Sequence, residues 1–180
     1  MIHMTSERRT SPFLVNPVNP VQVTCHPHGR LLTQPGQSDT ISFVSAPHYC
    51  DEHILAYPIE YIAGIDLYNS GEFHAAHDAW EERWMGPVAP DEKLFLQAMI
   101  QSAVAFHHLQ IGRPGAARRM YLMAKEKFAR LNQPVFMSLD LADYQAQLDR
   151  ALSWLLSVRD PREIEQPEIV PPTIRLVAMT

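Results

Sequence analysis

A short stretch near the middle of the chain places imidazole and carboxylate groups on neighbouring turns of one predicted helix. His77 and Glu81 stand four residues apart, a spacing that puts both side chains on the same helical face. Asp78 and His74 lie along the edge of that face. An imidazole and a carboxylate, joined by a third ligand, can hold zinc, iron or manganese and leave coordination positions open for water. Such a metal could generate hydroxide for hydrolysis near neutral pH.

The next predicted helix supplies a third imidazole. His107 stands on the apolar side of this helix, where a buried histidine needs a polar partner. We therefore expect His77, Glu81 and His107 to meet between the helices over residues 72–85 and 91–109, as a candidate site for a divalent metal cofactor. The alternative for the same side chains is a structural hydrogen-bond network that fixes one helix on the other.

Helical periods and short turns predict the elements that must position these groups. Apolar residues recur at helical spacing, and the connections are too short for anything but antiparallel neighbours. The chain is therefore expected to be all-α, an antiparallel bundle of about five helices. The predicted helices cover residues 58–68, 72–85, 91–109, 114–131 and 140–155, with Asp91 and Asp140 as N-caps of the third and fifth. The third helix is apolar almost all round, so we expect it at the centre.

Three segments follow from these elements. Residues 58–159 are expected to form the helical domain, and residues 160–180 an extended C-terminal tail. Residues 1–57 form a Pro-rich arm, because prolines exclude a long helix there. Residues 21–24 and 41–44 could pair in it as a short hairpin. The arm has too few large apolar residues for a core of its own, so we expect it to lie along the bundle.

The arm contains a second candidate metal site. Cys25 and His28 repeat the spacing of Cys50 and His53, and two such half-sites are a plausible set for tetrahedral zinc. Short cysteine and histidine pairs also arise by chance, so the other interpretation is four unliganded residues in a reducing compartment.

Composition limits the classes of partner. The 180 residues carry a net charge of −5, and the 15 lysines and arginines are scattered, which argues against nucleic acid and anionic membranes. The sequence has no apolar run long enough to span a bilayer, so a cytoplasmic location is expected. The partners that remain are a small molecule or another protein, including a second copy of this chain.

A weak internal repeat favours a different function. Gly71 precedes two alanines at positions 75 and 76, and Gly112 precedes two alanines at positions 116 and 117 in the same register. Repeated helical hairpins are typical of scaffold modules that bind other proteins. A non-enzymatic interaction module is therefore the alternative to an enzyme, with Arg118 and Arg119 on its outward faces.

The chain also resembles the domain of unknown function 309 family over about residues 60–157. The resemblance is carried by residues 63–73 (AGIDLYNSGEF), 76–84 (AHDAWEERW) and 95–101 (FLQAMIQ), and continues through 107–112, 115–116 and 139–141. It implies an all-α bundle catalogued as a predicted metal-dependent hydrolase without an established substrate. By position, the family's His-Glu pair falls on His77 and Asp78, its following acid on Glu81 and its later histidine on His107. Asp78 stands where the family usually has Glu, so its carboxylate reaches less far.

Overall fold

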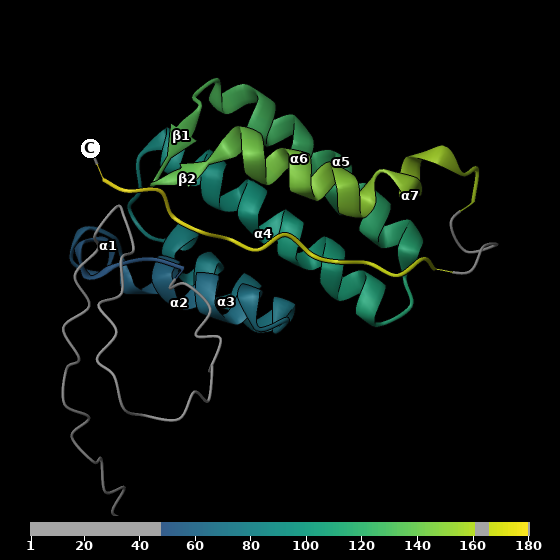
Figure 1. Ribbon diagram of the computed structural model, residues 1–180, viewed down its shortest axis with the longest axis horizontal. Coiled ribbons are helices and arrows are strands. Elements are labelled where there is room, and N and C mark those ends of the chain that lie inside the picture. The colour runs from purple at the N-terminus through teal and green to yellow at the C-terminus, as the bar shows by residue number, and fades with distance from the viewer. Residues whose placement is uncertain (1–47, 161–165, 180) are drawn as a thin grey trace, which may run out of the picture.

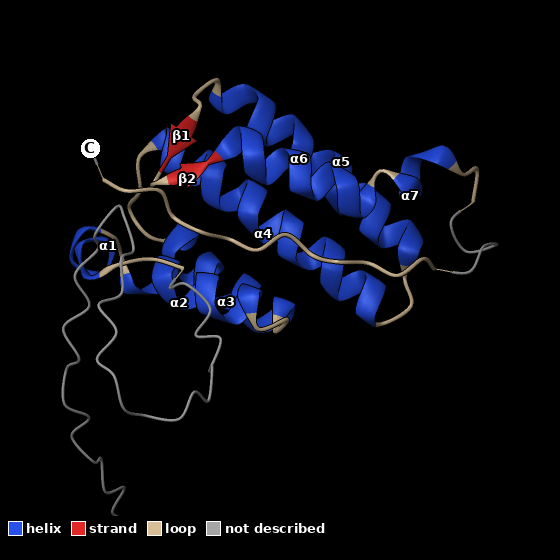
Figure 2. Ribbon diagram, viewed as in Figure 1, coloured by secondary structure: helices blue, strands red, loops and turns tan. Residues whose placement is uncertain are grey.

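The computed structural model describes residues 48–160 and 166–179. Figure 2 shows that helices dominate this part of the chain, with one very short hairpin. The helices are α1 (Asp51–Ala56), α2 (Ile59–Asn69), α3 (Phe73–Met85), α4 (Pro90–Gln110), α5 (Pro114–Leu131), α6 (Leu141–Leu152) and α7 (Trp154–Ser157). Strands β1 (Val135–Phe136) and β2 (Leu139–Asp140) pair antiparallel. The expectation of an all-α bundle is confirmed, and the hairpin expected at residues 21–24 and 41–44 lies outside the described residues.

Helix α4 lies at the centre of the bundle, between α2 and α3 on one side and α5 and α6 on the other (Figure 1). It packs against both α3 and α5, while α2 packs against α3. Its side chains are buried on most of its circumference, and Phe95, Leu96 and Met99 are fully enclosed. This confirms the central position expected from the apolar sequence of this helix.

Glycine and proline set the ends of the helices that matter for the site. Gly71, before α3, and Gly112, before α5, have φ values of +84° and +68°, in the left-handed region that favours glycine. Pro90 and Pro114 occupy the first positions of α4 and α5, where a missing N–H costs nothing. Asp91 is therefore inside the first turn of α4 and not its N-cap, which corrects the predicted start of this helix.

The last predicted helix is divided in the structure. Asp140 caps α6 as expected, because its carboxylate accepts a hydrogen bond from the Asp143 N–H at 2.9 Å. The helix ends at Leu152, and α7 follows after Ser153. Leu155 is nevertheless fully buried, so the apolar period is kept across the break. The short hairpin before α6 was not predicted.

The C-terminal tail runs lengthwise along the bundle as an extended segment (Figure 1). Ile174 is fully buried, and the Asn69 carboxamide at the end of α2 bonds to both its N–H and its carbonyl, at 2.8 and 2.9 Å. Leu176 forms an isolated β-bridge with Leu139. The domain limits at residues 57 and 159 stay predictions, and α1 lies before the first of them. Among the described helices, none has the length and apolar character needed to cross a membrane.

The contact between α2 and α3 depends on the absence of a side chain at Gly64. A Cβ at this position would overlap the indole ring of Trp80, which is fully buried and donates its N–H to the Tyr61 carbonyl at 3.2 Å. We expect Gly64→Ala to lower the free energy of unfolding by at least about 2 kcal/mol, because an overpacked core must shift backbone or ring. Urea unfolding would measure the loss.

Gly115 provides the matched control, because a Cβ there meets nothing within 4 Å. Gly115→Ala in the first turn of α5 should leave the free energy of unfolding unchanged or raise it by up to about 1 kcal/mol. Its urea midpoint should therefore equal or slightly exceed that of the wild-type protein. Equal midpoints for the two variants would contradict this account of the α2–α3 contact.

Candidate functional site

Helix α3 has a buried apolar face and a polar edge that is exposed to solvent. Phe73, Ala76 and Trp80 are buried, which fixes the rotation of the helix on α2 and α4. The same rotation places the His77 side chain at the rim, 24% exposed, while Asp78 and Glu81 are 59% and 42% exposed. His77 therefore lies at the edge of the contact between helices and not in the core. It lies where a solvent ion or substrate can reach it.

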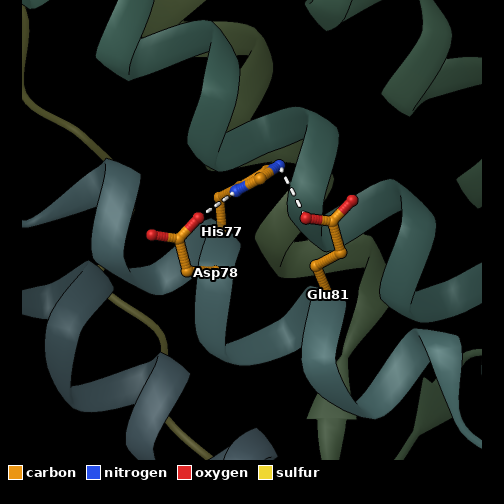
Figure 3. Close-up of side chains that lie close together, drawn as sticks. All are labelled: His77, Asp78 and Glu81. Carbon is orange, nitrogen blue, oxygen red and sulfur yellow. Dashed lines mark hydrogen bonds and ion pairs between the residues drawn. The ribbon is translucent and has the colours of Figure 1, made fainter.

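The two ring nitrogens of His77 face two different carboxylates (Figure 3). Nδ1 lies 2.8 Å from Asp78 Oδ1, and Nε2 lies 3.8 Å from Glu81 Oε2. Because an ionised carboxylate only accepts, the short contact fixes Nδ1–H as the donor. In the neutral ring, the lone pair of Nε2 then faces Glu81. A cation, a water molecule or a proton on Nε2 could satisfy these two acceptors, because both side chains are partly exposed.

Asp78 links His77 to a second imidazole. His74 Nδ1 lies 3.2 Å from Asp78 Oδ2, one helical turn away. The pKa of the Asp78 carboxyl is lowered, first by its hydrogen bond with His77, against an opposing effect of burial, and further by the charges of His74 and His77. Asp78 therefore stays ionised and can hold the His77 ring in one orientation.

A shallow hollow of about 250 Å³ opens beside this edge, between α3 and α4. The residues lining it are His74, His77, Val104, His107, His108, Ile111 and Arg113. His107 packs edge-on against His74, with ring centroids 4.9 Å apart. It thus faces the same hollow as His77, but the close group of ligand atoms consists of His77, Asp78 and Glu81, all within 4.8 Å of one another. The role of His107 as a metal ligand stays a prediction.

The far end of the hollow has a different electrostatic character. The pKa of His108 is lowered, first by burial and then by the charges of His107, Arg113 and Arg119. His108 Nδ1 is buried without a hydrogen-bond partner in the described part of the chain. Gln101 lies on the same stripe of α4 as His108, and its Oε1 is likewise buried without such a partner. Burial and the nearby positive charges therefore favour the neutral form of His108.

Two of the four residues of the second candidate metal site, Cys50 and His53, belong to the described part of the chain. Cys25 and His28 lie outside the described residues, so the four-residue zinc site stays a prediction. His53 is buried, and its Nδ1 accepts the Cys50 N–H at 3.1 Å and lies 3.2 Å from Cys50 Sγ. Its Nε2 donates to the Val177 carbonyl at 3.0 Å. Both ring nitrogens are thus engaged, Nδ1 at the start of α1 and Nε2 with the C-terminal tail, and a metal would have to displace one of these bonds.

The sequence identified the candidate residues of α3 but not which of them bond to one another. Helical spacing brings His77 and Glu81 together, whereas the bond between His77 and its direct neighbour Asp78 depends on side-chain rotamers. Arg113 was not identified, although its position after the left-handed Gly112 places it where α4 ends and α5 begins. A cation at that turn is the signal that would have found it.

The hydrogen bond between His77 and Asp78 should control the pKa of the Asp78 carboxyl. A lowered folded-state pKa stabilises the protein above the unfolded value, roughly 3.9, and this stabilisation disappears as the pH falls through the lowered value. In a carbon NMR titration, His77→Ala should return the Asp78 pKa toward its ordinary range. His74→Ala should change it less, because its charge is a smaller cause. A larger effect from His74→Ala would contradict the assigned bond.

Comparison with known proteins agrees with the resemblance seen in the sequence. No curated protein matches the chain. The family model described as a domain of unknown function (DUF309) matches residues 61–120, a segment that runs from α2 into α5 and contains His77, Asp78, Glu81, His107 and Arg113. The resemblance expected over about residues 60–157 is thereby confirmed for residues 61–120, which are similar to the DUF309 family, and from residue 121 to about 157 it stays a prediction.

Proposed function

We propose that the polar edge of α3 binds a divalent cation and that the protein is a metal-dependent hydrolase. The observation that carries this proposal is the convergence of His77, Asp78 and Glu81, each with a ligand atom within 4.8 Å of the others. The histidine-lined hollow beside them offers room for a substrate next to the cation.

The separation of the two facing acceptors suits a cation. Nitrogen and oxygen ligands lie about 2.1 Å from zinc, so two of them in tetrahedral arrangement are roughly 3.4 Å apart. The observed distance from His77 Nε2 to Glu81 Oε2 is 3.8 Å. Both side chains are partly exposed, and a small rotation of Glu81 would close the difference. His77 and Glu81 are therefore the direct ligands that the geometry supports.

Asp78 has a different part in this proposal. Its carboxylate accepts the His77 Nδ1–H, which fixes the tautomer and turns Nε2 toward Glu81. Histidines that bind metals commonly donate their other N–H to a carboxylate in this way. The shorter side chain of Asp, where the family usually has Glu, is compatible with this orienting role because it contacts its direct neighbour.

The remaining residues of the hollow offer groups for proton transfer and apolar walls. A divalent cation supplies Lewis acidity, polarising a substrate oxygen and lowering the pKa of a water molecule. Imidazoles are suited to act as general acids and bases, and His74 and His107 line the hollow beside His77. Val104 and Ile111 form its apolar lining.

The alternative is that the same side chains form a structural network without a metal. It is supported by the 2.8 Å bond between His77 and Asp78, which satisfies both groups without a cation. In this alternative solvent satisfies the Glu81 carboxylate, which is 42% exposed. The two interpretations therefore differ in what occupies the space between Nε2 and Glu81.

Metal binding should depend on the direct ligands. We expect the purified protein to bind Zn²⁺ or Mn²⁺ in equilibrium dialysis, with binding abolished by His77→Ala or Glu81→Ala. Asp78→Ala should weaken it about 10- to 100-fold, because the imidazole loses its orienting partner. Metal content by elemental analysis is the readout.

Glu82→Ala is the matched control, since Glu82 is an exposed acid on the same helix outside the group. It should bind metal like the wild-type protein. If His77→Ala and Glu82→Ala bind equally well, the cation site is excluded and the network alternative stands. That network would make His77→Ala cost less than about 1 kcal/mol of stability, because the pair is partly exposed.

A further inference from the structure

A second hollow, of about 580 Å³, lies at the beginning of α5 and is strongly basic. Four arginines line it, together with a single acid: Arg113, Arg118, Arg119, Arg159 and Asp160. Four positive charges and one negative charge leave an excess of three, in a protein whose net charge is −5. Such a local reversal of sign favours an anionic ligand.

Backbone bonds hold two of these arginines at the wall of the hollow. Arg118 Nη1 donates to the carbonyls of Val158 and Arg159, both at 3.3 Å, and Arg119 Nη1 donates to the Gly115 carbonyl at 3.4 Å. A guanidinium has five N–H donors, so these bonds occupy only part of its capacity. Arg113 and Arg119 are exposed at the mouth of the hollow.

The backbone adds to the positive potential. The hollow includes Pro114, Gly115 and Ala116, which form the first turn of the 18-residue α5, where the helix dipole is positive. Gly115 faces open space, so a ligand can approach the chain there without meeting a side chain. The arginines remain the main contribution, and the dipole acts in the same direction.

The basic hollow adjoins the histidine-lined one. Arg113 lines both, and Ile111 in the wall of the histidine-lined hollow is followed directly in the chain by Gly112 in the wall of the basic one. The charges of Arg113 and Arg119 also act on His108, which lines the first hollow. Moving along α3 and α4 to α5, the surface therefore changes from the carboxylates of Asp78 and Glu81, through four histidines, to the arginines.

We infer that the substrate of the proposed hydrolase carries a phosphate group, which Arg113 and Arg119 anchor in the basic hollow while the bond to be cleaved lies near His77. This inference rests on the proposed function for the identity of the reaction, but the anchoring is a binding event of its own. Arginine suits a phosphate because its planar fork donates two parallel N–H bonds to a pair of phosphate oxygens.

Phosphate binding can be tested on the full chain without any metal. Calorimetric titration of inorganic phosphate into the metal-free protein, at constant ionic strength set by chloride, should show saturable binding. Arg113→Gln and Arg119→Gln should each weaken it about tenfold, because a charge-assisted hydrogen bond is worth a factor of that order. Arg130→Gln is the matched control, since Arg130 is an exposed arginine in the last turn of the same helix. It should bind phosphate like the wild-type protein.

The other outcomes overturn the inference. Binding that does not exceed that of chloride, or that Arg113→Gln and Arg130→Gln weaken equally, removes the anchoring site. If acetate binds as tightly as phosphate, the hollow binds anions without a preference for phosphate. Because no metal is present, failure here leaves the cation proposal untouched, and failure of the cation proposal leaves phosphate binding intact.

Discussion

The contact between the Trp80 indole and Gly64 decides how α3 sits in the bundle. The ring lies against the α2 backbone where a side chain is missing, and its N–H reaches the Tyr61 carbonyl. Trp80 lies one helical turn from His77 in α3, so fixing the ring also fixes the direction in which His77 leaves the helix. Glu81, next in the chain, follows the same rotation. The position of the candidate metal ligands is thus a consequence of core packing.

The core around this contact is aromatic and closely connected. Tyr68 of α2 lies 5.1 Å from Phe73, 5.8 Å from Trp80 and 6.0 Å from Phe106, measured between ring centroids. It also accepts a hydrogen bond from the Tyr144 hydroxyl at 3.2 Å, and burial raises the pKa of Tyr144 to about 12. Both hydroxyls therefore stay neutral and satisfied in the interior. Tyr68 of α2 thus contacts α3, α4 and α6. These contacts fix α3 relative to the other helices, and with it the candidate metal ligands.

Much of this fold follows from local sequence, because periodicity and helix-breaking residues act over short distances. The central position of α4, the turn at Gly71 and the cap at Asp140 were all predictable in this way. Long-range pairings were not. The bonds from Asn69 to Ile174 and from His53 to Val177 join segments far apart in the chain, and neither has a periodic signal.

The candidate site shows the same division on a smaller scale. The spacing of His77 and Glu81 is a property of any helix, so sequence alone places them together. Which nitrogen of His77 faces which carboxylate depends on rotamers, and the packing of His107 against His74 depends on the register of α3 on α4. A residue's membership of a face can therefore be predicted, whereas its partner within that face cannot.

The proposed cation and phosphate sites place opposite demands on one short surface. A divalent cation beside several arginines would be repelled, since exposed charges interact over about 8–10 Å at physiological ionic strength. The chain separates the two demands by element: the carboxylates of Asp78 and Glu81 belong to α3, and the arginines gather around the beginning of α5. Histidines lie between the carboxylates and the arginines. Burial and the nearby arginines favour the uncharged form of His108, which keeps positive charge from extending toward α3. An anion at the arginines would reduce the remaining repulsion, so the two proposed sites are compatible on one surface.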